Sequence, residues 1–185
     1  MFIRTVDEGL ARLLRAKIPL PANVADVSFA PPTVHWAATI SRPTVSLFLY
    51  EVKPSERPGQ AIVRRLGPDG RSQRRLPSPV LEMNYLVSAW AADPLAEHQL
   101  LGEVINLLVA HPILPDECLP GDATSPVQLI FSGDENNPMR DIWRAAGGQQ
   151  RASFTLSAVA AADSFPWTDE APPVTEVLRG LSRRT

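Results

Sequence analysis

Apolar residues near the start of the chain recur at steps of three and four residues. An α-helix turns once in about 3.6 residues, so this spacing gathers the apolar side chains on one stripe. Pro19 and Pro21 stop the pattern. The sequence therefore predicts an amphipathic helix that buries one face over residues 3–18. Its apolar positions are Ile3, Val6, Leu10, Leu13, Leu14 and Ile18.

Two segments in the middle of the chain are typical of strands inside a sheet. Residues 44–52, TVSLFLYEV, are rich in β-branched and aromatic side chains and too short for a typical helix. In residues 81–92 the odd positions from Leu81 to Val87 face one way and the even positions face the other, because side chains alternate along a strand. Shorter strands are predicted at residues 24–29, 127–131 and 151–161, and a loop at 31–43.

A second long helix follows the strand of residues 81–92. Asp93 is expected to cap its N-terminus, with Pro94 at the first helical position, because a carboxylate accepts from free backbone N–H groups and proline lacks one. The helix is predicted to end near His111, since the residue before a proline disfavours helical backbone. Its predicted buried stripe comprises Leu101, Val104, Ile105, Leu108 and Val109.

The order of these elements indicates an α+β fold. A turn over residues 132–138 and a short helix over 138–148, stopped by glycine, complete the pattern. Helices and strands in this order predict a single mixed α/β domain over residues 1–162, with a mixed or antiparallel sheet flanked by helices. Residues 163–185 are predicted to form a proline-broken C-terminal tail with a short element at 174–181.

The composition is that of an ordinary globular chain. Of 185 residues, 44% are hydrophobic and 21% are charged, and no apolar run approaches the roughly 20 residues that span a bilayer. The N-terminus mixes charges of both signs into its apolar positions, unlike a secretory signal, so the cytoplasm is the expected compartment of synthesis. Cys118 is the single cysteine, which excludes an intramolecular disulfide and a cysteine-cluster metal site. With 18 basic and 20 acidic side chains, no overall field attracts nucleic acid or a membrane surface.

Positive charge gathers in one segment, residues 53–79, which also holds turn residues and is predicted to form a hairpin or arm. Two interpretations remain open. The segment is either a solvated loop kept soluble by its charge, or an interface that clamps an acidic protein surface through bidentate guanidinium contacts. Nucleic acid is the weaker partner, because the segment has no aromatic side chain on which a base could stack. The candidate interface residues are Arg57, Arg64, Arg65, Arg71, Arg74 and Arg75.

The three histidines do not form a catalytic or metal-binding set. His98 and His111 are thirteen positions apart, which places them about 140° apart around a helix and about 20 Å apart along it. His98 is expected to face solvent, and His111 to cap carbonyl groups at the helix end. A small hydrolytic enzyme could use His35 with a nearby acid, but no GxSxG motif supports this alternative. Phosphate-loop, GxGxxG and EF-hand patterns are absent as well, so no cofactor or metal is expected.

Four stretches resemble one known family in their order and spacing. They are VDEGLARLL, SRPTVSLFLYEV, PSPVLEMNYLVSAWAADPLAEHQLLGEVINLLVAHPIL and PMRDIWRAAGGQQRASFTLSAVA. From about Val6 to Ala161 they resemble the cap, or tail-terminator, protein of contractile injection systems. These systems are phage-tail-like particles with a tube inside a contractile sheath. The most specific tract runs from Tyr85 to Leu114, and the basic segment is not matched motif by motif.

The resemblance implies a tail-terminator-like fold and a structural protein that is not an enzyme. Six copies would form a ring, a hexamer, at the end of the particle away from the baseplate, where the ring stops growth of the inner tube and the sheath. The implied partners are further copies of the chain, the tube protein and the sheath protein. The implied location is the assembled particle, inside the producing cell or after release. A domain that longer relatives add after the last matched strand is not expected here.

Overall fold

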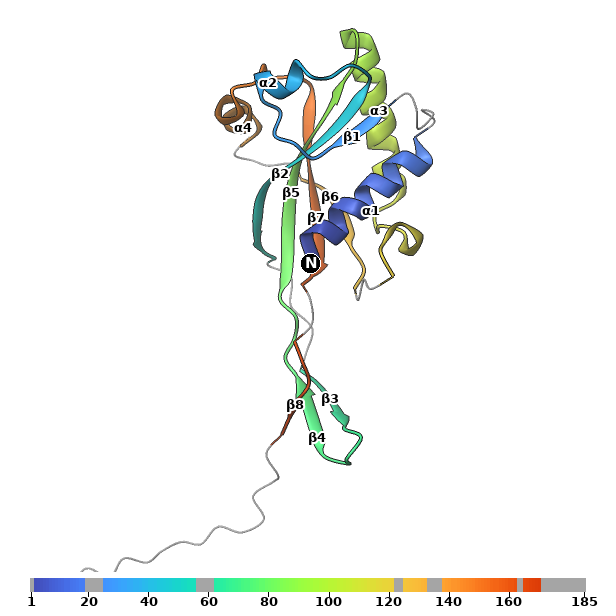
Figure 1. The fold of residues 1–185 in the computed structure, drawn as a ribbon, viewed down its shortest axis with the longest axis vertical. Helices are drawn as coiled ribbons and strands as arrows, with labels where there is room; N and C mark the ends of the chain where they lie inside the picture. The colour runs from blue at the N-terminus through green and yellow to red at the C-terminus, as the bar shows by residue number, and fades with distance from the viewer. Residues whose placement is uncertain are drawn as a thin grey trace, which may run out of the picture.

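The computed structural model describes residues 2–18, 25–55, 62–121, 125–132, 138–162 and 165–170. A body of helices around a five-stranded sheet carries a small three-stranded sheet that projects from one end (Figure 1). The elements in chain order are α1 (Phe2–Lys17), β1 (Asp26–Ser28), α2 (Val34–Ala37), β2 (Thr44–Pro54), β3 (Val63–Leu66), β4 (Ser72–Arg75), β5 (Val80–Trp90), α3 (Pro94–Ala110), the 3-10 helix η1 (Asp116–Cys118), β6 (Gln128–Ser132), α4 (Pro138–Ala146), β7 (Ser153–Ala161) and β8 (Thr168–Asp169).

The main sheet is mixed. Its strand order is β1-β2-β5-β7-β6, in which β1 runs parallel to β2 and all other neighbours are antiparallel. The long strands β2 and β5 pair from Thr44 opposite Trp90 to Pro54 opposite Leu81, with an irregularity at Tyr50. The predicted α+β class, with a mixed sheet flanked by helices, is confirmed. The predicted long helices and strands lie within two residues of the observed bounds.

Helices α1 and α3 cover one face of the main sheet (Figure 1), and their apolar stripes form the larger core with the odd-numbered residues of β5. The predicted stripe of α1 is buried from its second turn onward, whereas Ile3 in the first turn is 37% exposed. The pattern therefore located the buried face of α1 correctly. Its buried members are Val6, Leu10, Leu13, Leu14 and Ile18.

One polar contact joins α1 to the sheet. The hydroxyl of Tyr85, fully buried on β5, donates a hydrogen bond to Asp7 Oδ1 at 2.8 Å. Burial raises the pKa of Asp7, and this outweighs the lowering that the hydrogen bond from Tyr85 produces. A raised pKa means that the folded chain holds the proton more tightly than the unfolded chain. The stability that the protonated carboxyl contributes is therefore lost as the pH rises above about 4.

We expect Asp7→Asn to keep an acceptor for the Tyr85 hydroxyl while it removes the buried charge. The variant should melt no lower than wild type at about pH 7, and any advantage should vanish near about pH 3, where the carboxyl is protonated in both states. Thermal melts across this range check the prediction. Tyr85→Phe is the control, because it removes the donor and should steepen the loss of stability with rising pH. An Asn variant destabilised only at neutral pH would contradict it.

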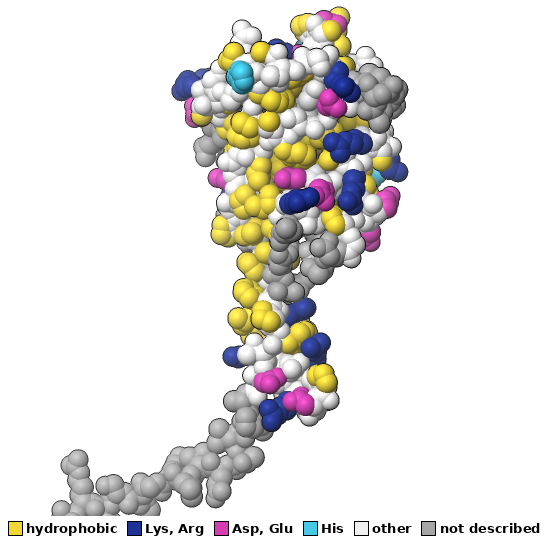
Figure 2. Space-filling view, in the orientation of Figure 1, with side chains coloured by type: hydrophobic (Ala, Val, Ile, Leu, Met, Phe, Trp, Pro, Cys, Tyr) yellow, Lys and Arg dark blue, Asp and Glu magenta, His cyan; other side chains and the backbone are white. Residues whose placement is uncertain are grey.

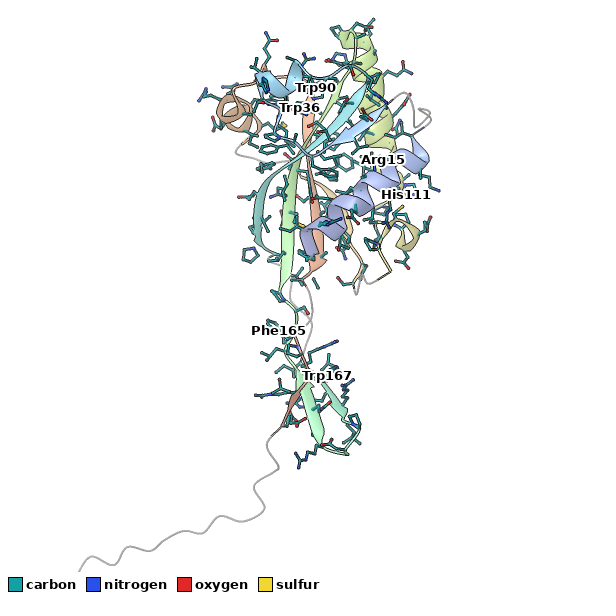
Figure 3. All side chains as sticks on the ribbon, viewed as in Figure 1. Arg15, Trp36, Trp90, His111, Phe165 and Trp167 are labelled. Carbon is teal, nitrogen blue, oxygen red and sulfur yellow. The ribbon has the colours of Figure 1, made fainter. Side chains whose placement is uncertain are left out.

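The opposite face of the sheet lies under α2 and α4 and holds a second, smaller core (Figure 1). Trp36 packs edge-on against Trp90 with ring centroids 5.2 Å apart, and Trp143 lies 6.2 Å from Trp90. Figure 3 shows Trp36 and Trp90 together at the end of the body opposite the small sheet. Leu86 and Trp90 on β5 face this core, which confirms the predicted alternation of even and odd positions.

The loop predicted over residues 31–43 is wrong at Val34–Ala37, which form helix α2. Thr33 caps this helix, because its hydroxyl oxygen accepts a hydrogen bond from the Trp36 N–H at 3.1 Å. Four residues are too few to show a helical period, so the hydrophobic pattern could not reveal the helix. Packing of Trp36 on Trp90 then holds α2 against the sheet.

Helix α3 begins as predicted. Asp93 Oδ1 accepts hydrogen bonds from the backbone N–H groups of Leu95 at 2.9 Å and Ala96 at 3.0 Å. At the other end, His111 Nδ1 lies 2.8 Å from the carbonyl oxygen of Leu107, which confirms its structural role at the helix end. His98 is exposed, as expected.

The buried stripe of α3 differs in part from the prediction. Leu101, Val104 and Leu108 are buried as predicted, and Ile105 is partly buried against the core. Val109, however, is 62% exposed, and Leu100 is buried instead. Apolar residues surround much of this helix, so their spacing alone does not say which side faces the sheet. As a result α3 presents apolar side chains to solvent along one side.

Candidate interface on the projecting arm

Strands β3 and β4 form the predicted hairpin, with Val63 opposite Arg75 and Leu66 opposite Ser72. The connecting turn has the sequence GPDG, and Gly70 takes a φ of 76°, a left-handed conformation that glycine adopts without strain. We call the segment 62–79, together with residues 165–170, which include β8, the arm. It projects along the long axis of the molecule, away from the body (Figure 1).

A short strand from the C-terminal part of the chain completes the small sheet. β8 pairs antiparallel with β4, which gives the order β3-β4-β8. Gln73 Nε2 donates to Asp169 Oδ1 at 2.9 Å, and the Ser72 hydroxyl donates to Glu170 Oε2 at 2.6 Å. The Arg64 guanidinium pairs with Glu170 Oε1 at 3.0 Å. The arm is therefore built from two segments about a hundred residues apart in the sequence, such as Ser72 and Glu170.

The contacts of Glu170 make the pairing of β8 with β4 sensitive to acid. The hydrogen bond from Ser72 lowers the pKa of Glu170 most, and the Arg64 guanidinium lowers it further. A lowered pKa means that the carboxylate contributes stability above its unfolded value of about 4.3, and that this contribution is lost as the pH falls through the lower folded value. Acidification therefore weakens the attachment of β8 to β4.

Trp167 lies against the arm just before β8. The guanidinium carbons of Arg65 and Arg75 lie 4.1 and 4.9 Å from the centre of its ring, which are distances of cation–π contacts. Figure 3 shows Trp167 beside the small sheet, with Phe165 between it and the body. The arm segment has no aromatic residue of its own, and the fold supplies one from the C-terminal part of the chain. The two guanidinium groups over this ring compete with any base that would stack there.

The structure brings five of the six predicted arginines together on the arm, and the sixth, Arg57, lies outside the described residues. Two of the five meet a carboxylate. Arg64 pairs with Glu170, as described above, and Arg71 pairs with Asp69 in the turn at 3.5 Å. Both arginines are largely exposed, so each pair contributes little to stability.

The remaining three arginines meet no carboxylate in the part of the chain that the structure describes. They share the arm with exposed apolar side chains, of which Leu66 is 76% exposed and Leu76 is 50% exposed. Figure 2 shows hydrophobic side chains, in yellow, from the lower part of the body down to the arm, beside arginines and lysines in blue. The charge of Arg74 nevertheless helps to lower the pKa of Glu170, so it is partly compensated. Positive charge without an ion pair next to exposed apolar surface is typical of a protein contact. The three arginines are Arg65, Arg74 and Arg75.

Sequence reasoning missed the residues that close the arm. Trp167, Asp169 and Glu170 belong to the predicted proline-broken tail, in which a two-residue strand shows no period. The one sequence signal for these residues was charge. The carboxylates of Asp169 and Glu170 can pair with arginines, and arginines can also contact the ring of Trp167. The predicted domain boundary at residue 162 stays a prediction, and the predicted element at 174–181 lies outside the described residues.

We expect Trp167→Ala to loosen β8 without unfolding the body. Loss of two cation–π contacts, each about 0.5–1 kcal/mol at exposed sites, should speed amide exchange in β4 and β8 by about tenfold. Hydrogen–deuterium exchange measures this, and the thermal midpoint of the body should not change. Phe165→Ala is the matched control, since Phe165 is 44% exposed and no guanidinium contact is seen at its ring. Equal exchange in both variants would contradict the assignment.

The remaining candidate groups lie apart from one another. His35 is exposed on α2, and in the described residues no acidic side chain bonds to it. Glu97 on α3 is only 14% exposed and pairs with Arg151, whose guanidinium lies 4.3 Å from the Trp90 ring centre. Across the described ranges, no three His, Cys, Asp or Glu side chains gather as metal ligands would.

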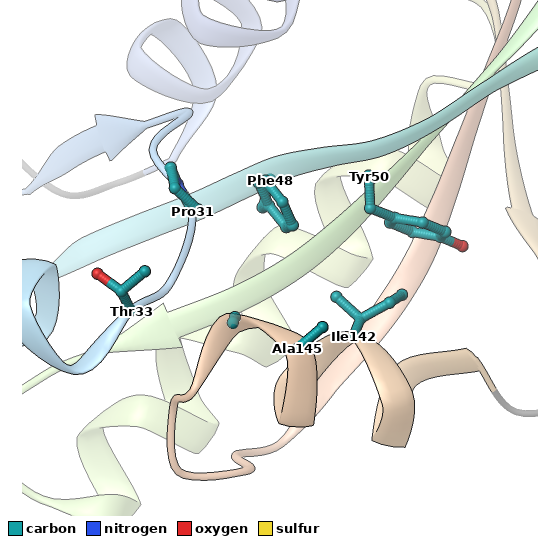
Figure 4. Close-up of a pocket in the computed structure, with 7 residues that line it drawn as sticks. Pro31, Thr33, Phe48, Tyr50, Ile142 and Ala145 are labelled. Carbon is teal, nitrogen blue, oxygen red and sulfur yellow. The ribbon is translucent and has the colours of Figure 1, made fainter.

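One apolar pocket lies between α4, β2 and the segment before α2 (Figure 4). Its volume is about 410 Å³, and no carboxyl, imidazole, amine or thiol lines it, so it holds no general acid or base for neutral pH. Its lining residues are Pro31, Thr33, Phe48, Tyr50, Ile142, Ala145 and Ala146. Within the described part of the chain, no helix has both the length and the apolar character to cross a bilayer.

The fold is that of proteins that end contractile tails. It matches the PVC sheath/tube terminator of an extracellular contractile injection system in its extended state, with a TM-score of 0.67 and 24% identity over 100% of this chain. It also matches the tube-terminating cap of the anti-feeding prophage, with a TM-score of 0.65 and 18% identity over 95% of this chain. The chain spans 65% and 60% of the lengths of these two proteins.

The sequence profile of the Pvc16 N-terminal domain matches residues 5–176, so the chain belongs to this family. The resemblance found in the sequence is thereby confirmed, and so is the expected tail-terminator-like fold. The search of curated proteins gives no significant match.

Proposed function

We propose that this protein is a structural cap that ends the inner tube and the sheath of a contractile injection system, at the end distal to the baseplate. The observation that carries the proposal is the fold that the whole chain shares with the PVC sheath/tube terminator. Family membership over residues 5–176 supports the same conclusion.

The cap acts by shape and contact and carries out no reaction. In support of this, His35, His98 and His111 lie on separate elements or separate ends of one helix, and no carboxyl, imidazole, amine or thiol lines the apolar pocket. Proton transfer requires a donor or acceptor within hydrogen-bond reach of the reacting atom, and these groups do not converge on one point.

The cap works as a ring of identical copies, six in number, that contacts both the tube protein and the sheath protein. A ring requires a heterologous contact, in which one patch of a copy meets a different patch of the next and the rotation closes. The arm supplies one such patch, through the arginines from Arg64 to Arg75, and Arg57 remains a candidate from the sequence. The chain is made in the cytoplasm and works in the assembled particle.

The arm favours a protein partner over nucleic acid. Two of its five described arginines already meet carboxylates, and Arg65 and Arg75 lie over the ring of Trp167, where they compete with any base that would stack there. Exposed leucines beside the arginines suit an apolar protein surface and have no counterpart on a phosphate backbone.

Deletion of the gene in the producing cell tests the proposal. Particles made without the protein should have tubes and sheaths of variable length with ragged distal ends in electron micrographs. Wild-type protein supplied from a plasmid should restore uniform length, and antibody against the protein should label one end only. Unchanged lengths and ends after deletion would refute the proposal.

A further inference from the structure

Exposed apolar side chains concentrate on two surfaces of the chain. In the part of the chain that the structure describes, twelve large hydrophobic residues are exposed, of which six lie on the arm or the adjoining end of β2 and three lie on or just after α3. Single exposed apolar residues need no explanation, but a concentration of nine in two places indicates contact surfaces. The six are Val52, Ile62, Val63, Leu66, Leu76 and Phe165, and the three are Leu95, Val109 and Ile113.

The exposed side of α3 carries an apolar residue near each end, with Gln99, Gly102 and Asn106 on the same side between them. At about 100° per residue, Leu95 and Val109 lie only about 40° apart around the helix axis. Leu95 is 79% exposed. Gly102 lies between Leu95 and Val109 in the sequence, and a Cβ added to it would have no other atom within 4 Å. We call this side of α3, with Ile113 beyond its end, the α3 outer face. Apolar residues on the outer side of a surface helix indicate that another surface covers them.

A small cavity adjoins the α3 outer face. Its volume is about 140 Å³, close to that of engineered cavities of about 150 Å³ that bind benzene, so one aliphatic side chain fits. The carboxylate of Glu103 lies at the same cavity and makes no ion pair within the described residues. The lining residues are Pro43, Ala91, Ala96, Gln99, Leu100 and Glu103.

Charge separates the two surfaces. Residues 80–121, which include α3, contain six carboxylates and no lysine or arginine. Of these, Glu82 pairs with Lys53 and Glu97 with Arg151, so on α3 Glu103 is the carboxylate without an ion pair in the described residues. The arm contains five arginines against three carboxylates, Asp69, Asp169 and Glu170. The two surfaces therefore carry apolar side chains in common and charges of opposite sign, which are the properties of complementary partners.

We propose that the arm of one copy docks on the α3 outer face of the next copy, with an arm leucine in the small cavity and an arm arginine facing Glu103. The inference rests on the proposed ring. Figure 1 shows the arm projecting from one end of the body, while the N-terminal end of α3 lies toward the other, so one chain does not make this contact with itself. The contact is heterologous and repeats around a closed ring.

Single substitutions test each side of the contact. Leu66→Asp on the arm and Leu95→Asp on α3 should each weaken self-association by at least about tenfold, because each places a carboxylate in an apolar contact. Val34→Asp is the matched control, since Val34 is 65% exposed and lies on neither surface. Sedimentation velocity and native mass spectrometry measure the association, and circular dichroism should show the same melt for all three variants. A Leu66→Asp variant that associates as well as wild type, or a monomeric wild type, would overturn the inference.

Paired charge reversal shows whether the two surfaces meet each other. Arg74→Glu and Glu103→Arg should each weaken association, and the double variant should regain most of it, because the charges are again opposite across the contact. A double variant that associates more weakly than either single variant would overturn the inference.

A second experiment adds the same proteins to tube and sheath protein. Arm variants that still self-associate but no longer cap tubes would show that the arm contacts tube or sheath protein. That result would overturn the inference without contradicting the proposed function.

Discussion

The Leu101→Asp variant is expected to lose its cooperative thermal melt. Leu101 is 9% exposed and belongs to the larger core between α3 and the main sheet. The substitution removes a buried leucine side chain, which costs about 2–5 kcal/mol, and places a carboxylate without a partner in the same space. Domains are stable by only about 5–15 kcal/mol, so the sum approaches the whole stability of the chain. Far-UV circular dichroism against temperature and urea checks the result.

Val109→Asp is the control on the same helix. Val109 is 62% exposed, so its substitution should change the free energy of unfolding of the monomer by no more than about 0.5 kcal/mol. The pair also tests which side of α3 faces the sheet, since the sequence pattern placed both residues in the buried stripe. Equal melts of the two variants would show that the packing of α3 is wrong.

The Trp143→Ala variant should destabilise the body by about 3–5 kcal/mol, which corresponds to a fall of about 6–20 °C in melting temperature for a chain of this size. Trp143 is 1% exposed, and its Nε1 donates to the Ser153 hydroxyl at 3.1 Å. Its surroundings are tightly packed, because a Cβ on Gly148 would lie 2.4 Å from the Pro32 carbonyl oxygen and 3.3 Å from the Trp143 ring. A cavity left by Trp143 therefore cannot collapse easily.

Trp167→Ala is the comparison for Trp143→Ala, because it removes the same side chain from the arm. Its thermal midpoint should match wild type, since the arm packs against neither core. Differential scanning calorimetry on both variants separates the two outcomes. A Trp143→Ala variant that melts with wild type would mean that the second core contributes nothing, and a large loss in Trp167→Ala would mean that the arm and body unfold as one unit.

Most of the body could be predicted from local pattern. The stripe of α1, the alternation in β5 and the Asp93 cap each follow from chemistry within a few residues, and the structure has all three. The predictions that failed concern features that depend on contacts between residues far apart in the sequence. α2 is held by Trp36 on Trp90, more than fifty residues away in the sequence, and Val109 is exposed because of how α3 lies on the sheet. The parallel pairing of β1 with β2 is likewise a property of topology.

The candidate interface shows the same division. The gathering of arginines was visible in the sequence, but which of them are neutralised depends on β8, whose Glu170 meets Arg64 across 106 positions. Arg65 and Arg75 make cation–π contacts with Trp167, which also comes from the C-terminal part of the chain. Sequence composition therefore predicted where arginines gather, and tertiary pairing decides which of them meet a carboxylate.

Tube growth in the presence of the purified protein tests the central claim most directly. The tube protein is polymerised with increasing amounts of the protein, and lengths and end labels are read from electron micrographs. A cap should bind one end of each tube, and mean length should fall as the ratio of cap to tube protein rises, because a capped end adds no subunits. Tubes whose lengths do not change at saturating amounts, with label absent or spread along their sides, would contradict the account.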